Sequence, residues 1–207
     1  MLKHPFCPSL RFLGILLMGM ACGPAFAAPV NFSVIDANGS ALADAVVAVE
    51  LAGARPTAPP GTQAEMGQRN RAFVPTLLVV QTGTAVSFPN FDTVRHHIYS
   101  FSSAKPFEIK LYAGTPAAPV VFDKAGTAIL GCNIHDRMAA FIHVVNTPHF
   151  AITRKDGVAT LDLPAGEHTL QVWHAQMGDK QLPQRQGLKV QAAGGTHVVR
   201  LGGAGKP

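Results

Sequence analysis

Residues 127–145 read TAILGCNIHDRMAAFIHVV, and this stretch decides the fold. Apolar and β-branched residues before Cys132 and after Met138 predict two short strands joined by a turn. The turn carries the spacing C-x2-H-x2-M, formed by Cys132, His135 and Met138. Because Cys132 ends the first strand, we expect the turn to fold the other two side chains back towards its sulfur.

An upstream histidine, His96, follows the segment FPN at residues 88–90 and completes a set of four candidate ligands. A thiolate and two imidazoles in a trigonal arrangement, with a long contact to a thioether, form the copper site of blue electron-transfer proteins. The four side chains therefore predict one bound copper ion of the type 1 class. Asp92 and Asp136 flank the ligand segments. We expect them either to accept hydrogen bonds from the ligands or to form turns.

The rest of the chain is typical of short strands separated by turns. The 20 glycines and 16 prolines favour turns over long helices. Residues 52–71 are rich in Pro, Gly, Ala and Gln and predict a linker or long loop, within which residues 64–70 are the best candidate for a helix. Many short strands at this spacing predict an all-β sandwich. The expected strands cover residues 30–34, 45–49, 77–80, 85–88, 98–101, 107–111, 120–122, 151–153, 159–163, 169–173 and 198–201.

The two ends of the chain resemble one domain cut in two. Residues 34–47, VIDANGSALADAVV, are similar to the opening of carboxypeptidase regulatory-like, or prealbumin-like, sandwiches. Residues 152–157, ITRKDG, and 163–170, LPAGEHTL, resemble the middle and end of the same pattern. The resemblance implies a prealbumin-like β-sandwich of residues 28–63 plus 147–207, with residues 64–146 inserted as a second domain. A single enlarged sandwich is the alternative.

Residues 73–146 resemble a cupredoxin of the plastocyanin/azurin superfamily, with a short ligand loop similar to that of amicyanin. The resemblance rests on FVP at residues 73–75, GTAVSF at residues 83–88 and Asn90, in addition to the ligand motif. It implies a Greek-key β-sandwich in which four side chains take the family's metal-binding roles. These are the imidazoles of His96 and His135, the thiolate of Cys132 and the axial thioether of Met138.

The whole chain also resembles exported proteins commonly labelled methylamine utilization protein, which pair F-P-N-x-D with C-N-I-H-D-x-M. Two positions depart from the plastocyanin-like pattern. His97 stands where Asn usually follows the first histidine, so His97 is an alternative to His96 as the ligand. Adjacent side chains of a strand point to opposite faces, and we favour His96 as the inward one. Asn133 replaces the Ser or Thr that usually follows the cysteine, which alters the hydrogen bonding expected at the sulfur.

Residues 1–27 predict a secretory signal peptide. A basic start precedes the apolar run FLGILLMGM of residues 12–20, and Ala25-Phe26-Ala27 supplies the small residues of a cleavage site. Cleavage leaves Cys132 as the single cysteine, and the net charge of +5 falls to +3 because two basic residues are removed. In an exported protein such a lone thiol is a buried small side chain, a reactive group or a metal ligand. We expect a periplasmic protein without a membrane span, since no second apolar run approaches the length of one.

Composition and missing motifs exclude several functional classes. Of the 207 residues 47% are hydrophobic and 14% charged, which is too apolar for a disordered chain. Lys and Arg form no run, which argues against nucleic-acid binding. The sequence lacks G-x-S-x-G, H-E-x-x-H and P-loop motifs, and it lacks the H-x-H clusters of multicopper oxidases and copper nitrite reductases. We therefore expect no enzymatic activity.

These observations favour electron transfer in the bacterial periplasm by one copper ion that alternates between Cu(I) and Cu(II). We expect a monomer that exchanges electrons with a c-type cytochrome or a dehydrogenase. The alternative is a protein that binds and delivers copper through the same ligands without shuttling electrons. An adhesion-like sandwich with incidental copper is a third interpretation.

Overall fold

The computed structural model describes residues 27–202, which form seventeen β-strands, one short 3-10 helix and no α-helix. The expectation of an all-β fold is confirmed. The predicted signal peptide lies outside the described residues except for Ala27, which begins the first strand. Within residues 27–202, no helix has the length and apolar character needed to cross a membrane.

The strands are short and follow one another closely along the chain. The first nine are β1 (Ala27–Ile35), β2 (Val46–Glu50), β3 (Gln63–Glu65), β4 (Gly67–Arg69), β5 (Ala72–Val74), β6 (Leu77–Gln81), β7 (Thr84–Ser87), β8 (His96–Ser100) and β9 (Phe107–Tyr112). The remaining elements are β10 (Val120–Phe122), β11 (Gly126–Cys132), β12 (Ala139–Val145), β13 (Phe150–Ile152), β14 (Val158–Pro164), β15 (Gly166–Trp173), η1 (Ala175–Met177), β16 (Gln184–Val190) and β17 (Gly195–Arg200).

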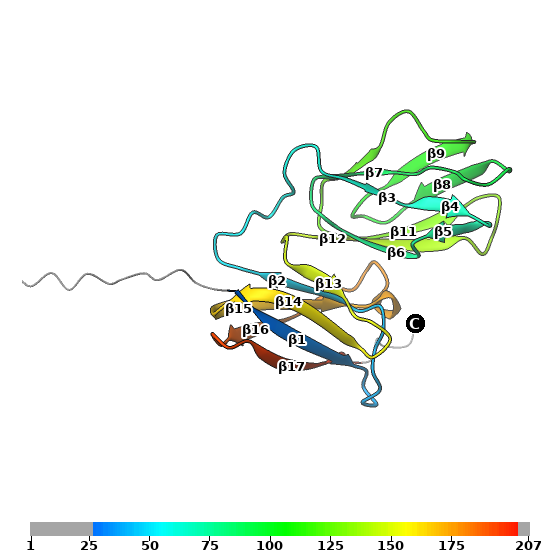
Figure 1. The fold of residues 1–207 in the computed structure, drawn as a ribbon. Coiled ribbons are helices and arrows are strands. Elements are labelled where there is room, and N and C mark those ends of the chain that lie inside the picture. The colour runs from blue at the N-terminus through cyan, green and yellow to red at the C-terminus, as the bar shows by residue number, and fades with distance from the viewer. Residues whose placement is uncertain (1–26, 203–207) are drawn as a thin grey trace, which may run out of the picture.

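Strands from both ends of the described chain form one group of two sheets, in the orders β14-β1-β17 and β13-β2-β15-β16 (Figure 1). β1 pairs antiparallel with β14 and parallel with β17, which joins the last strand to the first. Alternate residues of β1 are buried, at Val30, Phe32 and Val34. They pack with apolar residues of β2, β15 and β16 in one core, as the period of two in a strand predicts.

The strands between these ends form a second group, with a five-stranded sheet in the order β6-β12-β11-β8-β9 and a three-stranded sheet in the order β10-β7-β3. β4 pairs with β5 in a hairpin. The two sheets enclose a second core that includes Phe88, Phe122 and Ile142. Cys132 and Met138 belong to this core, where β11 leads into β12.

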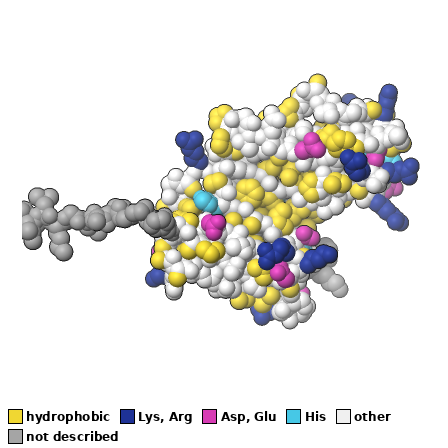
Figure 2. Space-filling model, viewed as in Figure 1, with side chains coloured by type: hydrophobic (Ala, Val, Ile, Leu, Met, Phe, Trp, Pro, Cys, Tyr) yellow, Lys and Arg dark blue, Asp and Glu magenta, His cyan; other side chains and the backbone are white. Residues whose placement is uncertain are grey.

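The two groups of sheets meet along a third apolar cluster. Its buried members are Val46, Ala48, Val79, Val145 and Trp173. Figure 2 shows hydrophobic side chains across the middle of the molecule, where the groups meet. The chain leaves the first group after β2 and returns to it at β13 (Figure 1). The division into residues 64–146 and residues 28–63 plus 147–207 stays a prediction. Along the chain, β1 and β2 belong to the first group of sheets, β3 and β6–β12 to the second group, and β13–β17 to the first again.

Two local expectations are wrong. Residues 52–71 are not one long loop and residues 64–70 are not a helix, because β3 and β4 lie there. β3 pairs in parallel with β7, and the completely buried Met66 and Gln68 hold the segment against the second core. β16 is absent from the expected strands because most of its residues are polar. It forms the edge of its sheet, where such residues stay exposed.

Candidate metal centre

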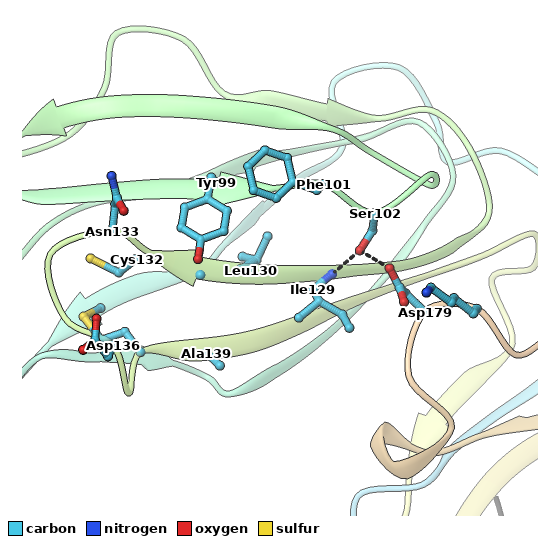
Figure 3. A pocket seen from close by; sticks show the side chains of 13 residues that line it. Tyr99, Phe101, Ser102, Ile129, Leu130, Cys132, Asn133, Asp136, Ala139 and Asp179 are labelled. Carbon is cyan, nitrogen blue, oxygen red and sulfur yellow. Dashed lines mark hydrogen bonds between the residues drawn. The ribbon is translucent and has the colours of Figure 1, made fainter. Parts of the chain in front are cut away.

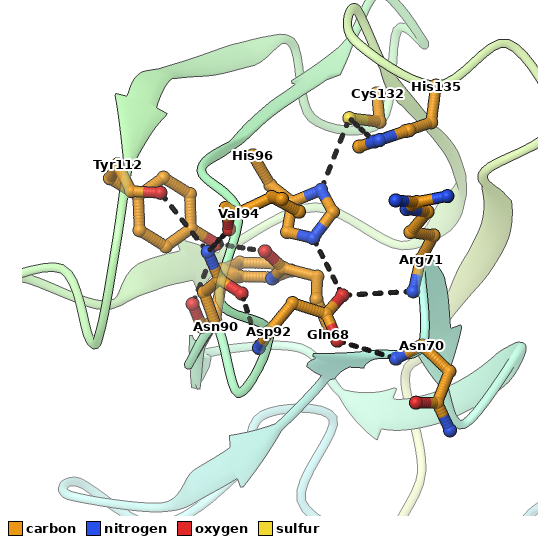
Figure 4. Close-up of polar contacts among 11 residues, drawn as sticks. Gln68, Asn70, Arg71, Asn90, Asp92, Val94, His96, Tyr112, Cys132 and His135 are labelled. Atoms are coloured by element: carbon orange, nitrogen blue, oxygen red, sulfur yellow. Dashed lines mark hydrogen bonds and ion pairs between the residues drawn. The ribbon is translucent and has the colours of Figure 1, made fainter.

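Three donor side chains meet at one end of the second core (Figure 4). Cys132 ends β11, His96 begins β8, and His135 lies on the segment 133–138, called the ligand loop below. Sγ of Cys132 lies 3.7 Å from Nδ1 of His96 and 4.0 Å from Nδ1 of His135. The three donor atoms lie within 4.8 Å of one another, and residues 27–202 contain no second cluster of three such donors.

Backbone pairing places His96 beside Cys132. β8 is antiparallel to β11, and Cys132 stands opposite Ile98. The backbone N–H of Asn133 donates to the carbonyl of His97 at 3.2 Å, so the contact between the two strands continues into the ligand loop. The separation of these two donors is therefore set by the sheet.

The ligand loop turns back before β12 begins. The backbone N–H of Met138 donates to the carbonyl of His135 at 3.0 Å. The Met138 side chain is buried and belongs to the same apolar cluster as Cys132. His135 is only partly buried, so it is the donor with access to solvent. The loop thus places a buried thioether and a partly exposed imidazole near the thiol of Cys132.

The spacing of the donor atoms fits a single metal ion. Donors about 2.1 Å from an ion and 120° apart around it lie about 3.6 Å from one another. The two separations from the sulfur, 3.7 Å and 4.0 Å, are close to this value. A trigonal set of two histidines and one cysteine with a weak methionine is the donor set of blue copper, whereas structural zinc sites are closed by four strong ligands.

His97 turns away from the three donors. Its Nε2 lies 2.8 Å from Oε1 of Glu108, in a pair at the surface. Every second residue of β8 is buried, and His96 is on the buried side with no exposed surface. The structure therefore brings His96, and not His97, to Cys132.

A carboxylate holds the far side of the His96 ring. Oδ2 of Asp92 lies 2.8 Å from Nε2 of His96. The same carboxylate accepts the backbone N–H groups of Asn70 at 2.6 Å and Arg71 at 2.9 Å (Figure 4). Burial opposes the ionisation of Asp92, but the hydrogen bonds from Arg71, His96 and Asn70 outweigh it and lower the pKa of this carboxyl group. By contrast Asp136, the other flanking carboxylate, is exposed on the ligand loop.

Asn90 shapes the loop that carries Asp92. Its amide donates to the carbonyls of Val94 at 2.8 Å and Tyr112 at 3.2 Å, and its Oδ1 accepts the backbone N–H of Asp92 at 2.9 Å. The hydroxyl of Tyr112 lies 2.8 Å from both Oε1 of Gln68 and the carbonyl oxygen of Phe88, and burial raises the pKa of Tyr112 to about 12. No sequence motif assigns Gln68 or Tyr112 to the site, because only the folded chain brings them beneath this loop.

An open groove of about 560 Å³ runs from the end of the sheet that carries Cys132 along β11 towards Asp179 of the other group of sheets (Figure 3). Cys132 lines one end of it. The ring of Tyr99 covers Gly131, and a methyl group on Gly131 would lie 2.6 Å from that ring. Tyr99 also packs against the exposed Phe101, with 5.0 Å between ring centroids. Only a glycine fits beneath Tyr99 without moving it.

The chain matches no protein-family model and no curated protein. Solved structures similar to it include amicyanin from Paracoccus versutus, with 13% identity and a TM-score of 0.34 over 47% of this chain and 96% of that one. A purple cupredoxin from Nitrosopumilus maritimus is 22% identical, with a TM-score of 0.34 over 40% of this chain and 98% of its own. A copper-containing nitrite reductase from Thermus scotoductus is 21% identical, with a TM-score of 0.38 over 54% of this chain and 28% of its own.

Proposed function

We propose that His96, Cys132 and His135 bind one copper ion, with Met138 as a weak axial ligand, and that the protein carries electrons in the periplasm. The observation that carries this proposal is the convergence of one thiol and two imidazoles within 4.8 Å. A buried methionine on the same loop completes the donor set of a type 1 copper site. On this proposal residues 64–146 are a cupredoxin domain, set in a carboxypeptidase regulatory-like sandwich, in a protein of the methylamine utilization type.

The bound copper would supply one-electron redox chemistry as Cu(I) and Cu(II). The protein's part is to hold the donors at fixed positions. His96 and Cys132 stand on two paired strands, and backbone hydrogen bonds hold the ligand loop near both of its ends. A donor set held in this way changes little between the two oxidation states, which keeps the reorganisation that accompanies electron transfer small.

His135 is the donor through which we propose that electrons enter and leave, because it is the one with access to solvent. The partner on this proposal is a periplasmic c-type cytochrome or a dehydrogenase, and the protein itself is a carrier and not an enzyme. Copper delivery would use the same ligands. The burial of His96, Cys132 and Met138 favours a carrier, since a delivery site must release its metal readily.

Titration of Cu(II) into the apo-protein tests the ligands. We expect one equivalent to bind and to give an intense visible band from thiolate-to-copper charge transfer. Cys132→Ser should lose the band, and His97→Ala is the matched control that should keep it. Bands of equal strength in wild type and Cys132→Ser would reject the thiolate. If His97→Ala loses the visible band and His96→Ala keeps it, the ligand is His97 and not His96.

Voltammetry and a copper-transfer assay separate the carrier from the delivery protein. A carrier gives a reversible one-electron wave and keeps its copper in the presence of an apo-protein acceptor. Rapid loss of copper to that acceptor, without a reversible wave, would establish delivery instead.

A further inference from the structure

Both ring nitrogens of His96 have a defined partner. Nδ1 faces Sγ of Cys132 at 3.7 Å, and Nε2 faces Oδ2 of Asp92 at 2.8 Å. A neutral imidazole carries its proton on one nitrogen and a lone pair on the other. The partner of Nε2 therefore decides whether the lone pair of Nδ1 points towards the metal position.

A tight hairpin turn fixes the position of Asp92. Asn70 and Arg71 connect β4 to β5, and both have positive φ angles, 54° and 58°. Two central residues with positive φ define the type I′ turn that suits a two-residue hairpin. The conformation is uncommon for an arginine, and it directs two successive backbone N–H groups at one carboxylate.

The Asp92 carboxylate is thereby restricted to accepting hydrogen bonds. Oδ1 accepts from Asn70, and Oδ2 accepts from Arg71 and faces His96. Because both oxygens of this group already accept backbone N–H groups, the geometry assigns Nε2 of His96 as the donor of the bond between them. The proton then stays on Nε2, and Nδ1 is left free to bind a metal.

We propose that Asp92 is a positioning residue of the metal centre, which fixes the Nδ1-binding form of His96 and lowers the reduction potential of the bound copper. This inference rests on the function proposed above. A carboxylate that is hydrogen-bonded to the ring nitrogen facing away from the metal makes an imidazole a stronger metal ligand. Its negative charge also stabilises Cu(II) more than Cu(I), which lowers the potential.

A purely structural role for Asp92 makes different predictions. In that case the carboxylate only ties the β4-β5 hairpin to the loop before β8, and its removal lowers stability without changing the potential. The chain supplies a matched control in Glu108, whose carboxylate lies at the same distance, 2.8 Å, from Nε2 of the adjacent but outward-facing His97. Glu108→Gln replaces a carboxylate by an amide beside a histidine in the same way as Asp92→Asn, but away from the donors.

The test compares wild type, Asp92→Asn and Glu108→Gln, each loaded with copper. We expect Asp92→Asn to weaken Cu(II) binding 10- to 100-fold, the range for partners of metal-binding histidines. Each tenfold loss that spares Cu(I) raises the potential by about 59 mV for one electron. Glu108→Gln should leave both quantities unchanged. Equal values in the two variants would overturn the proposal.

A measurement on the wild-type apo-protein guards against a variant that does not fold. ¹⁵N NMR of the neutral His96 ring should show the proton on Nε2, and Asp92→Asn should shift part of the population to Nδ1–H. Protonation of Nδ1 in the wild type would reject the role of Asp92. If the wild type binds no copper, the proposed function fails, whereas the NMR result still decides what Asp92 does to His96.

Discussion

Two buried histidines in the five-stranded sheet lie near opposite ends of β11. His96 neighbours Cys132, the last residue of that strand, whereas His143 on β12 stands opposite Thr127, near its start. Their exposed fractions, 0% and 3%, are almost the same. Burial therefore does not distinguish the candidate ligand from the other histidine, and the difference must come from their partners.

The partners of His143 are neutral. Its Nδ1 lies 2.9 Å from Oγ1 of Thr127, and its ring stacks on Trp173 with 4.5 Å between centroids. Burial lowers the pKa of His143 to about 4, so its ring is uncharged at neutral pH. His96 instead has a carboxylate on one nitrogen and a thiol on the other. The convergence of several donors, rather than the burial of one, marks the candidate metal centre.

The largest expected effect is on copper binding. His96→Ala removes a proposed ligand and should weaken Cu(II) binding more than 100-fold, beyond the effect of losing an outer partner. His143→Ala should keep the stoichiometry and the visible band, because its partners are not metal donors. Competition with a chelator of known affinity measures both variants. A loss of the band in His143→Ala that equals the loss in His96→Ala would remove the distinction between the two histidines.

The second expected effect is acid destabilisation from His143. Its pKa is about 4 in the folded protein, whereas an unperturbed histidine has a pKa of 6.5, so below pH 6.5 the unfolded chain binds a proton that the folded chain does not. The contribution of His143 to the free energy of unfolding should change little above pH 6.5 and should fall by about 3 kcal/mol as the pH drops to 4.

Urea unfolding at several pH values measures this effect. His143→Asn keeps a polar side chain beside Thr127 but cannot gain the proton, so its stability should fall less steeply than that of the wild type between pH 6.5 and 4. Parallel curves for the two proteins would show that the buried ring does not carry the acid sensitivity.

The ligand loop was predictable because its information is local. Cys132, His135 and Met138 lie within one turn between two apolar segments. In the structure β11 ends at Cys132 and β12 begins at Ala139. Alternation also predicts that one of His96 and His97 points inward. Which one does so depends on the register between β8 and β11. That register is a long-range property, and alternation within β8 alone does not determine it.

The support beneath His96 was not predictable in the same way. Asp92 stands close to His96 in sequence, but the N–H groups that hold it come from Asn70 and Arg71, more than twenty residues away. Those residues lie in the segment 52–71, whose composition indicates a loop. Pairing with distant strands, and not local propensity, gives this segment its structure.

The smallest expected effect concerns Gly131, the residue before Cys132, and it tests how tightly this end of the sheet is packed. A methyl group on Gly131 would lie 2.6 Å from the outer end of the half-exposed Tyr99 ring, so Gly131→Ala must displace that ring and should cost about 1 kcal/mol of stability. Gly187 on β16 is the control, since a methyl group there would meet nothing within 4 Å. Thermal or urea unfolding of the two variants measures the difference. If Gly131→Ala is as stable as Gly187→Ala, the Tyr99 ring moves freely and the Cys132 end of the sheet is less rigid than the carrier proposal requires.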